Sequence, residues 1–260
     1  MTRLDVWLAE HGLAESREKA QALVMAGRVR IDGAPASKPG VRVREASAVL
    51  VDPGPAHVGR GASKLAGALD VLEVDPAGRA VVDVGASTGG FTETLLARGA
   101  LRVYAVDVGR GQLHERLRTD PRVVVRDRTN ARALSAAEVP EPCSLATVDV
   151  SFISAAKILP ALRSVLAPGA EAVVLVKPQF EVGRGQVGRG GIVKDPALHR
   201  GALLSVATAA QALGYGIVGA CASPILGAEG NREFFLHLVR DGAPLAAVAL
   251  EERFRKVVGP

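Results

Sequence analysis

Short runs of apolar residues alternate with longer helical stretches over the last two thirds of the chain. Five of these runs have the length of a β-strand and end in a charged residue; they are residues 81–83, 103–107, 123–127, 145–149 and 173–177. Two further strands are expected near residues 216–221 and 233–239. Continuous apolar strands separated by helices predict an α/β fold with a mostly parallel, seven-stranded sheet that helices cover on both faces.

The first 50 residues follow a different pattern and predict a small α+β unit. Apolar positions between residues 4 and 13 favour a short helix. Ser16 is a candidate N-cap for a second helix that extends to residue 25, because its hydroxyl can accept a hydrogen bond from a free backbone N–H. Two short strands are expected at residues 29–31 and 41–43, where apolar and polar residues alternate.

A stretch rich in proline and glycine, residues 51–62, is expected to link this unit to the rest of the chain. The predicted domains are therefore residues 1–50 and residues 63–260, and the second begins with a helix at about 63–72. Within it, residues 183–191 form a basic, glycine-rich loop.

Composition narrows the classes of function. The chain of 260 residues has a formal net charge of +5, which is compatible with a polyanionic partner, and its 3% of aromatic residues argues against a platform of several stacking aromatics. Its two cysteines, Cys143 and Cys221, are far apart, which predicts a reduced, cytoplasmic protein without a disulfide framework or a metal site. No signal peptide is recognised and no apolar stretch reaches the roughly 20 residues that span a bilayer, so no membrane association is expected.

The strongest local motif is the glycine-rich segment that directly follows the first strand of the predicted sheet. Glycines let the backbone turn sharply and approach a ligand, and an acid at the end of the next strand can bind a ribose diol. The pattern Gly-x-Ser-x-Gly-Gly differs from the Gly-x-Gly-x-x-Gly of NAD enzymes, and an acid just ahead of it can face the cationic tail of S-adenosylmethionine. The candidate cofactor residues here are Asp83, Gly85, Ser87, Thr88, Gly89, Gly90, Phe91 and Asp107.

Other interpretations of this region stay open. An NAD enzyme fits the loop in part, and Gly-x-Ser-x-Gly also matches the nucleophile elbow of hydrolases, although no histidine partner is found at the expected strand end. The segment can also be a turn that binds no ligand. Asp127 and Arg128 follow the third strand, whose end lies near the adenine in this topology; the alternative for them is a capped turn.

Four motifs together resemble the TlyA family, the haemolysin A-type rRNA methyltransferases. They are residues 83–92 (DVGASTGGFT), 105–113 (AVDVGRGQL), 149–154 (DVSFIS) and 176–183 (VKPQFEVG). The resemblance covers nearly the whole chain. It implies a Rossmann-like, FtsJ-like methyltransferase domain that uses S-adenosylmethionine, and an N-terminal alpha-L RNA-binding motif. The implied reaction is 2′-O-methylation of cytidine in ribosomal RNA within ribosomal subunits, with no obligate protein partner.

The resemblance also implies a catalytic tetrad of Lys64, Asp149, Lys177 and Glu233. Asp149 and Lys177 end parallel strands, where open α/β sheets place their sites, and Glu233 begins the last strand at the same edge. Lys177 is expected to be the general base for the ribose hydroxyl, with Lys64 as a neighbouring cation that favours the neutral amine. Asp149 and Glu233 would orient the two lysines. Taken singly, Lys64 and Glu233 would be interpreted as surface charges.

The N-terminal unit carries basic residues that the resemblance assigns to RNA contact: Arg3, Arg17, Lys19, Arg28, Arg30 and Lys38. Acidic residues are interspersed, so a solvated surface of mixed charge is the alternative. Glu15 stands where relatives often carry a basic residue. On the glycine-rich loop, Arg184, Arg189 and Lys194 are candidates to hold RNA near the active site.

Three other functions were weighed. The haemolysin name suggests a membrane-lytic protein, but this sequence contains no membrane-spanning or strongly amphipathic segment. A non-catalytic RNA-binding factor would not need the tetrad. Methylation of the cytosine ring would use a cysteine nucleophile, and Cys143 precedes the fourth strand of the sheet instead of following it, which puts it at the wrong edge.

Overall fold

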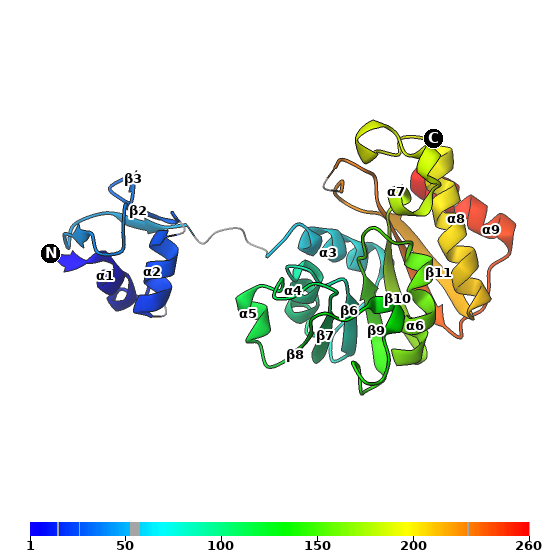
Figure 1. Cartoon of the computed structure of the whole chain (residues 1–260), viewed down its shortest axis with the longest axis horizontal. Coiled ribbons are helices and arrows are strands. Elements are labelled where there is room, and N and C mark those ends of the chain that lie inside the picture. Colours follow the sequence, from blue (N-terminus) through cyan, green and yellow to red (C-terminus); the bar gives the residue numbers. More distant parts are fainter. Residues whose placement is uncertain (15, 26, 53–57, 228, 260) are drawn as a thin grey trace. The chain divides into compact units, whose positions relative to one another are not determined.

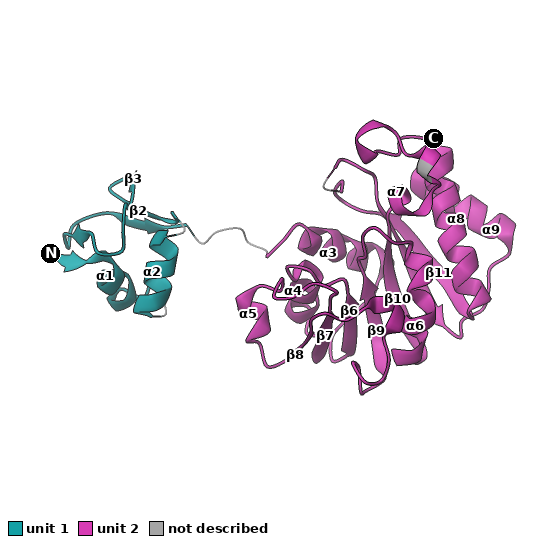
Figure 2. Cartoon of the chain, in the orientation of Figure 1, with its two compact units in different colours: residues 1–56 teal, residues 57–260 magenta. Residues whose placement is uncertain are grey.

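The computed structural model describes residues 1–14, 16–25, 27–52, 58–227 and 229–259. The chain forms two compact units, Met1–Ala56 (unit 1) and His57–Pro260 (unit 2), which Figure 2 distinguishes by colour. Both ends of the expected linker belong to regular structure, because Val51 ends a strand of unit 1 and Gly61 begins a helix of unit 2. Residues 53–57 of that segment, and Glu15, lie outside the described residues.

Unit 1 contains two helices and short strands, as predicted. Its elements are β1 (Thr2–Arg3), α1 (Leu4–Glu10), α2 (Arg17–Met25), β2 (Val29–Ile31), β3 (Ala34–Pro35), β4 (Arg42–Val43) and β5 (Val49–Val51). Ser16 accepts a hydrogen bond from the backbone N–H of Lys19 (3.2 Å), which is the predicted N-cap contact. The core is small and is made of Leu4, Trp7, Leu8, Ala20, Val24, Val29 and Val43.

Unit 2 is built on one seven-stranded sheet, which confirms the predicted fold class. In chain order its strands are β6 (Ala80–Val84), β7 (Arg102–Val106), β8 (Val123–Arg126), β9 (Cys143–Val148), β10 (Leu166–Val176), β11 (Tyr215–Ala222) and β12 (Phe234–Arg240). Across the sheet the order is β11-β12-β10-β9-β6-β7-β8. β12 runs antiparallel to both of its neighbours, whereas the pairs from β10 to β8 are parallel.

Helices cover both faces of this sheet (Figure 1). They are α3 (Gly61–Leu72), α4 (Gly90–Ala97), α5 (Glu115–Arg118), α6 (Leu159–Val165), α7 (Pro178–Glu181), α8 (Pro196–Ala212) and α9 (Ala247–Val258). Short 3₁₀ turns lie at Ala131–Ala133, Ala155–Lys157, Arg184–Gln186 and Arg189–Gly191. In the described part of the chain, no helix combines the length and the apolar character needed to cross a membrane.

Alternate residues of each strand pack into two separate cores. Val82 and Val84 of β6 face one core with residues of α6, α8 and α9, and Val81 faces the other with Leu65 of α3 and Leu95 of α4. Because side chains along a strand alternate between faces, a strand that is apolar at every position needs cover on both sides. Burial on both faces therefore explains the continuous apolar runs in the sequence.

Gly201 offers a test of how α8 is stabilised. It lies inside this helix with open space where a Cβ would be, so Gly201→Ala should raise the free energy of unfolding of unit 2 by up to about 1 kcal/mol through the lower entropy of the unfolded chain. Gly67→Ala in α3 is the matched control, because its Cβ would lie 2.9 Å from Cγ of Pro224 and should give no gain. Urea unfolding measures both; equal effects would contradict this account of the two glycines.

Candidate active site and nucleic-acid interface

The loop between β6 and α4 turns on backbone that side chains rarely adopt. Gly85, Ser87 and Gly89 have φ values of 85°, 49° and 100°. A Cβ on Gly85 would collide with the carbonyl oxygen of Asp149, and one on Gly89 would collide with Leu117. Gly85 therefore allows close packing against the backbone of Asp149, and Gly89 allows close packing against the side chain of Leu117.

Asp107, after β7, is tied to this loop by its carboxylate. Its Oδ2 accepts a hydrogen bond from the backbone N–H of Ser87 (2.8 Å), and its Oδ1 accepts one from Gly109 (2.7 Å). The structure thus brings the predicted loop and the predicted acid together. Each oxygen keeps a further lone pair for a ligand.

A cavity of about 570 Å³ opens at this edge of the sheet, between the ends of β6, β7 and β9. Its lining residues come from the loops after these strands and from the segments that follow β8 and β9: Gly85, Ser87, Val106, Asp107, Val108, Gln112, Thr129, Asn130, Ala131, Arg132, Asp149, Val150, Ser151, Phe152, Ile153 and Ile158. A smaller hollow of about 110 Å³ shares Gly85, Ser87 and Asp149 with it and adds Gly61, Ala86, Thr88, Gly90 and Phe91. Most of the predicted cofactor residues therefore line one of two adjoining spaces.

Four predicted cofactor residues line neither space: Asp83, Gly89, Asp127 and Arg128. Asp83 is fully buried below the loop, where its oxygens accept hydrogen bonds from the hydroxyls of Thr92 (2.7 Å) and Thr147 (2.9 Å). Asp127 accepts from Gly111 N–H (3.0 Å) and Arg118 Nη1 (3.2 Å), and these contacts hold its pKa below the usual value. Neither Asp127 nor Arg128 is among the residues that line the cavity.

The backbone conformation of Arg128 determines which residues after the third strand, β8, line the cavity. Its φ of 55° turns the chain, and Thr129 and Asn130 then line the cavity in place of Asp127. Neither residue was predicted from the sequence. The only signal was the polar pair itself, because a positive φ at an arginine cannot be anticipated from the sequence pattern.

The four residues of the predicted tetrad form two lysine–carboxylate ion pairs. Lys64 of α3 lies with Nζ 2.5 Å from Oε2 of Glu233, and Lys177 lies with Nζ 2.6 Å from Oδ1 of Asp149. Lys177 also donates a hydrogen bond to Oγ of Ser151 (2.9 Å). Both lysine side chains are only 10% exposed. Opposite charges this close and this well shielded from water interact strongly, and each holds its partner in place.

Strand ends explain how these residues meet. Asp149 follows β9 and Lys177 follows β10, which are parallel neighbours, so both lie at the same edge of the sheet. Glu233 precedes Phe234, which pairs with Val176 in the antiparallel ladder. The edge of the sheet therefore gathers three of the four residues, and α3 supplies the fourth.

Phe152 is an exposed aromatic residue at the mouth of the cavity. Its side chain is 91% exposed, its φ is 63°, and its ring centroid lies 5.2 Å from that of Phe180. A bulky residue with positive φ is a backbone outlier, and such outliers gather at functional sites. Phe152 and Ser151 belong to the motif of residues 149–154, in which only Asp149 was predicted to have a role.

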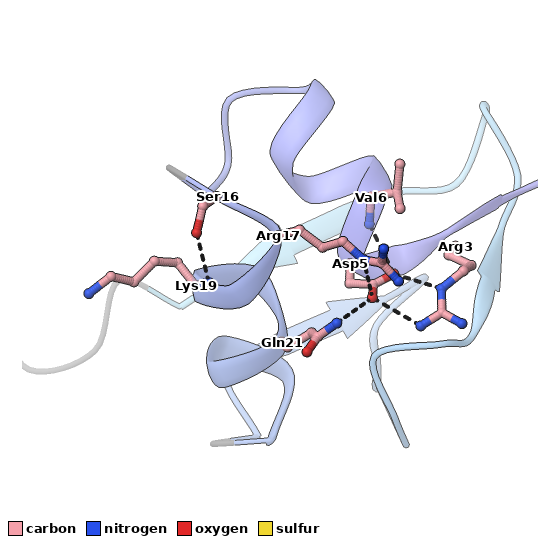
Figure 3. A network of polar contacts seen from close by, with 7 residues as sticks. All are labelled: Arg3, Asp5, Val6, Ser16, Arg17, Lys19 and Gln21. Atoms are coloured by element: carbon pink, nitrogen blue, oxygen red, sulfur yellow. Dashed lines mark hydrogen bonds and ion pairs between the residues drawn. The ribbon is translucent and has the colours of Figure 1, made fainter.

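In unit 1, two of the predicted RNA-contact residues share one carboxylate. The guanidinium groups of Arg3 and Arg17 both donate hydrogen bonds to the buried Asp5 (Figure 3). Lys19 and Lys38 are exposed, Arg28 donates to the carbonyl of Asp52 (3.0 Å) and Arg30 donates to that of Gly33 (3.0 Å). On the glycine-rich loop of unit 2, Arg189 and Lys194 are exposed, and the side chain of Arg184 lies outside the described part.

Comparisons with known proteins agree with this arrangement. Residues 57–240 match the FtsJ-like methyltransferase family and residues 2–49 match the S4 domain. The 16S/23S rRNA (cytidine-2′-O)-methyltransferase TlyA of Mycobacterium tuberculosis is 50% identical over 98% of this chain and 97% of its own length. The putative rRNA methyltransferase YqxC of Bacillus subtilis is 45% identical over 98% and 92%. A solved structure, a putative hemolysin from Streptococcus thermophilus, has 39% identity and a TM-score of 0.73 over 98% of this chain and 94% of that one.

The burial of Asp83 predicts a pH dependence of stability. Desolvation raises the pKa of Asp83 to about 6, against hydrogen bonds from Thr92 and Thr147 that lower it. The folded protein favours the protonated form of Asp83. The stability that this form contributes is fully present below about pH 4, the pKa of an aspartate in the unfolded chain, and is lost as the pH rises through 6. Asp83→Asn, which cannot ionise, should therefore gain stability over the wild type with rising pH, by about 1–3 kcal/mol at pH 8.

Urea unfolding of unit 2 at pH 4 and pH 8 measures this difference. Glu251→Gln, on the exposed face of α9, is the control and should show the same difference at both pH values. A difference between Asp83→Asn and the wild type that does not change with pH would contradict the assignment.

Proposed function

The chain belongs to the TlyA family of FtsJ-like methyltransferases, and on this premise we propose that it methylates the ribose 2′-hydroxyl of a cytidine in ribosomal RNA with S-adenosylmethionine. The observation that carries the proposal is the two shielded lysine–carboxylate pairs at the cavity edge of the sheet. Such groups can take the proton of a hydroxyl, which is what a ribose oxygen needs before it can attack a methyl group.

The cavity fits the cofactor in size and in the groups that it presents. Its volume of about 570 Å³ lies in the range of small-molecule sites, roughly 300–1,000 Å³. We assign Asp107, which lines the cavity, to the ribose hydroxyls of the cofactor, and the backbone of Gly85, which also lines it, to contact with the ligand. Thr129 and Asn130 stand where Asp127 and Arg128 were expected to meet the adenine. When bound, S-adenosylmethionine supplies an electrophilic methyl group on a sulfonium.

We assign Lys177 as the general base. Asp149 and Ser151 both contact its Nζ and both line the cavity, so the amine is held at the boundary between the cavity and the buried edge of the sheet. In this role the amine of Lys177 accepts the proton of the 2′-hydroxyl, so that the ribose oxygen becomes nucleophilic. Lys64, held by Glu233, is assigned as the neighbouring cation.

The exposed ring of Phe152 suits a nucleotide that has left its helix. A base must be unstacked before its ribose can enter a closed site, and an aromatic face next to that site gives the base a new stacking partner. Methylation of the cytosine ring instead would need a reactive thiolate, but Cys143 begins β9 at the opposite edge of the sheet, and burial raises the pKa of its thiol to about 12.

Unit 1 is proposed to bind ribosomal RNA within ribosomal subunits. Its match to the S4 domain and its cluster of basic side chains support this role. Phosphate contacts of this kind fix position and orientation and leave the choice of nucleotide to the catalytic unit. The proposed substrate is cytoplasmic, and we expect the enzyme to act there.

The base assignment predicts a specific loss of turnover. Lys177→Ala should bind S-adenosylhomocysteine normally but lose methyl transfer to ribosomal subunits by about 10²-fold or more, because the proton acceptor is gone. Cys143→Ser is the control and should keep nearly full activity. An RNA substrate with 2′-deoxycytidine at the modified position, located by mapping ribose methylation, should accept no methyl group. Transfer to that substrate would overturn the proposed acceptor, and full activity in Lys177→Ala would overturn the base.

Asp107 predicts the strength of cofactor binding. Asp107→Ala should weaken binding of S-adenosylhomocysteine by about 10- to 100-fold, the scale of losing hydrogen bonds to a charged group. Asp120→Ala is the control, since Asp120 pairs with Arg122 and is not among the residues that line the cavity. Calorimetry measures both variants. Binding of NAD without binding of S-adenosylhomocysteine would rule out the proposed cofactor.

A further inference from the structure

Asp5 joins three side chains of unit 1 through a single buried carboxylate (Figure 3). Arg3 donates to it from Nε and Nη2 (3.0 Å each), in the two-pronged geometry that suits a guanidinium and a carboxylate. Arg17 donates from Nε (3.0 Å) and Gln21 from Nε2 (2.8 Å), both to Oδ2. The backbone N–H of Val6 completes the set at Oδ1 (3.0 Å).

The network is buried at the carboxylate and open at the arginines. The side chain of Asp5 is 0% exposed, whereas those of Arg3 and Arg17 are 49% and 56% exposed. Asp5 contacts one Nη group of Arg3 and neither Nη group of Arg17, so three Nη groups without an acceptor among the described residues are left for one from solvent. Two guanidinium groups are therefore anchored from below and present donors outward.

The carboxylate keeps its charge under all working conditions. The hydrogen bonds from Arg3, then those from Gln21 and Arg17, hold the pKa of Asp5 far below its usual range despite its burial. A long arginine side chain on a surface normally samples many rotamers and must be ordered when it binds. Anchoring to a fixed, charged carboxylate removes much of that freedom before any ligand arrives.

A third cation lies beside this pair. Arg42 of β4 is exposed and stands directly opposite Arg3 in the antiparallel β1–β4 ladder. Directly opposed residues project from the same face of such a ladder, and the neighbouring Val43 faces the core. Sequence analysis did not select Arg42.

We propose that Asp5 is a positioning residue for RNA binding: it holds Arg3 and Arg17 as a preformed site for one phosphate of the RNA backbone, with Arg42 as an adjacent cation. The inference rests on the proposed function of unit 1 and adds how two of its arginines are held in position. Outward guanidinium donors with fixed spacing match the geometry of a phosphate, which accepts several charge-assisted hydrogen bonds at once.

The proposal predicts that removing the charge of Asp5 changes the affinity for RNA in the direction opposite to that expected from net charge alone. Removing a negative charge from an RNA-binding surface should strengthen binding if only the overall field matters. Asp5→Asn removes such a charge but frees both arginines. We therefore expect it to weaken binding to salt-washed ribosomal subunits by about tenfold, the scale of ordering two flexible side chains on binding. Glu18→Gln, an exposed charge beside Arg17 on α2, is the matched control and should bind as tightly as the wild type or slightly tighter.

The salt dependence separates positioning from loss of structure. Asp5→Asn keeps every cation of unit 1, so the slope of the logarithm of the binding constant against the logarithm of salt concentration should stay that of the wild type. If unit 1 unfolded, the slope would fall because its phosphate contacts would be lost. Arg17→Lys serves as a second variant at an exposed site: it keeps the charge but cannot bridge a carboxylate and a phosphate with a rigid fork, and it should also bind several-fold more weakly.

Binding is measured with the full-length chain and labelled subunits at several salt concentrations. Weaker binding by Asp5→Asn and Arg17→Lys with an unchanged slope supports the proposal. Wild-type affinity in Arg17→Lys, or an Asp5→Asn variant that binds as well as Glu18→Gln, overturns it. A wild-type protein that does not bind ribosomal subunits would instead refute the proposed function.

Discussion

The close approach of Gly85 to the carbonyl group of Asp149 fixes the active site of unit 2. No side chain fits between the two backbones. Hydrogen bonds from the N–H groups of Gly85 and Ala86 to Val106, and from Asp149 to Val84, connect the same strand ends. Backbone contacts thus join three neighbouring strands at their carboxyl ends. The cofactor loop, Asp107 and Asp149 all take their positions from this junction, so a shift in one must move the others.

The two ion pairs depend on that junction and also constrain it. A charged group taken out of water needs a partner, and removing one member of such a pair leaves the other uncompensated. The Lys64–Glu233 pair fastens α3 to the start of β12, and the Lys177–Asp149 pair connects the ends of β10 and β9. The proposed chemistry and the two observed ion pairs involve the same four side chains. This is a reason for the site to be built on strand ends, which hold side chains more rigidly than long loops.

The sequence was sufficient for the sheet but only partly for the site. Strands that are buried on both faces appear in the sequence as continuous apolar runs, which is why all seven strands of the sheet in unit 2 could be recognised. In unit 1, β1 and β5 have only two and three residues and show no such pattern. The tetrad residues came from resemblance, and which lysine pairs with which acid depends on ladder register and helix placement. Asp83 and Asp127 looked like ligand contacts because each ends an apolar run of the sequence, but neighbouring hydroxyl, N–H and guanidinium donors engage them away from the cavity.

The position of β12 gives the chain an order of assembly. This strand is the last in sequence, yet it lies between β10 and β11 in the sheet and carries Glu233 at its start. During synthesis, β11 leaves the ribosome before the strand that will connect it to the sheet exists. Until β12 inserts, β10 has an open edge and Lys64 has no carboxylate partner. A single late event therefore closes the sheet and completes the proposed active site, so a nascent or interrupted chain cannot carry a finished site.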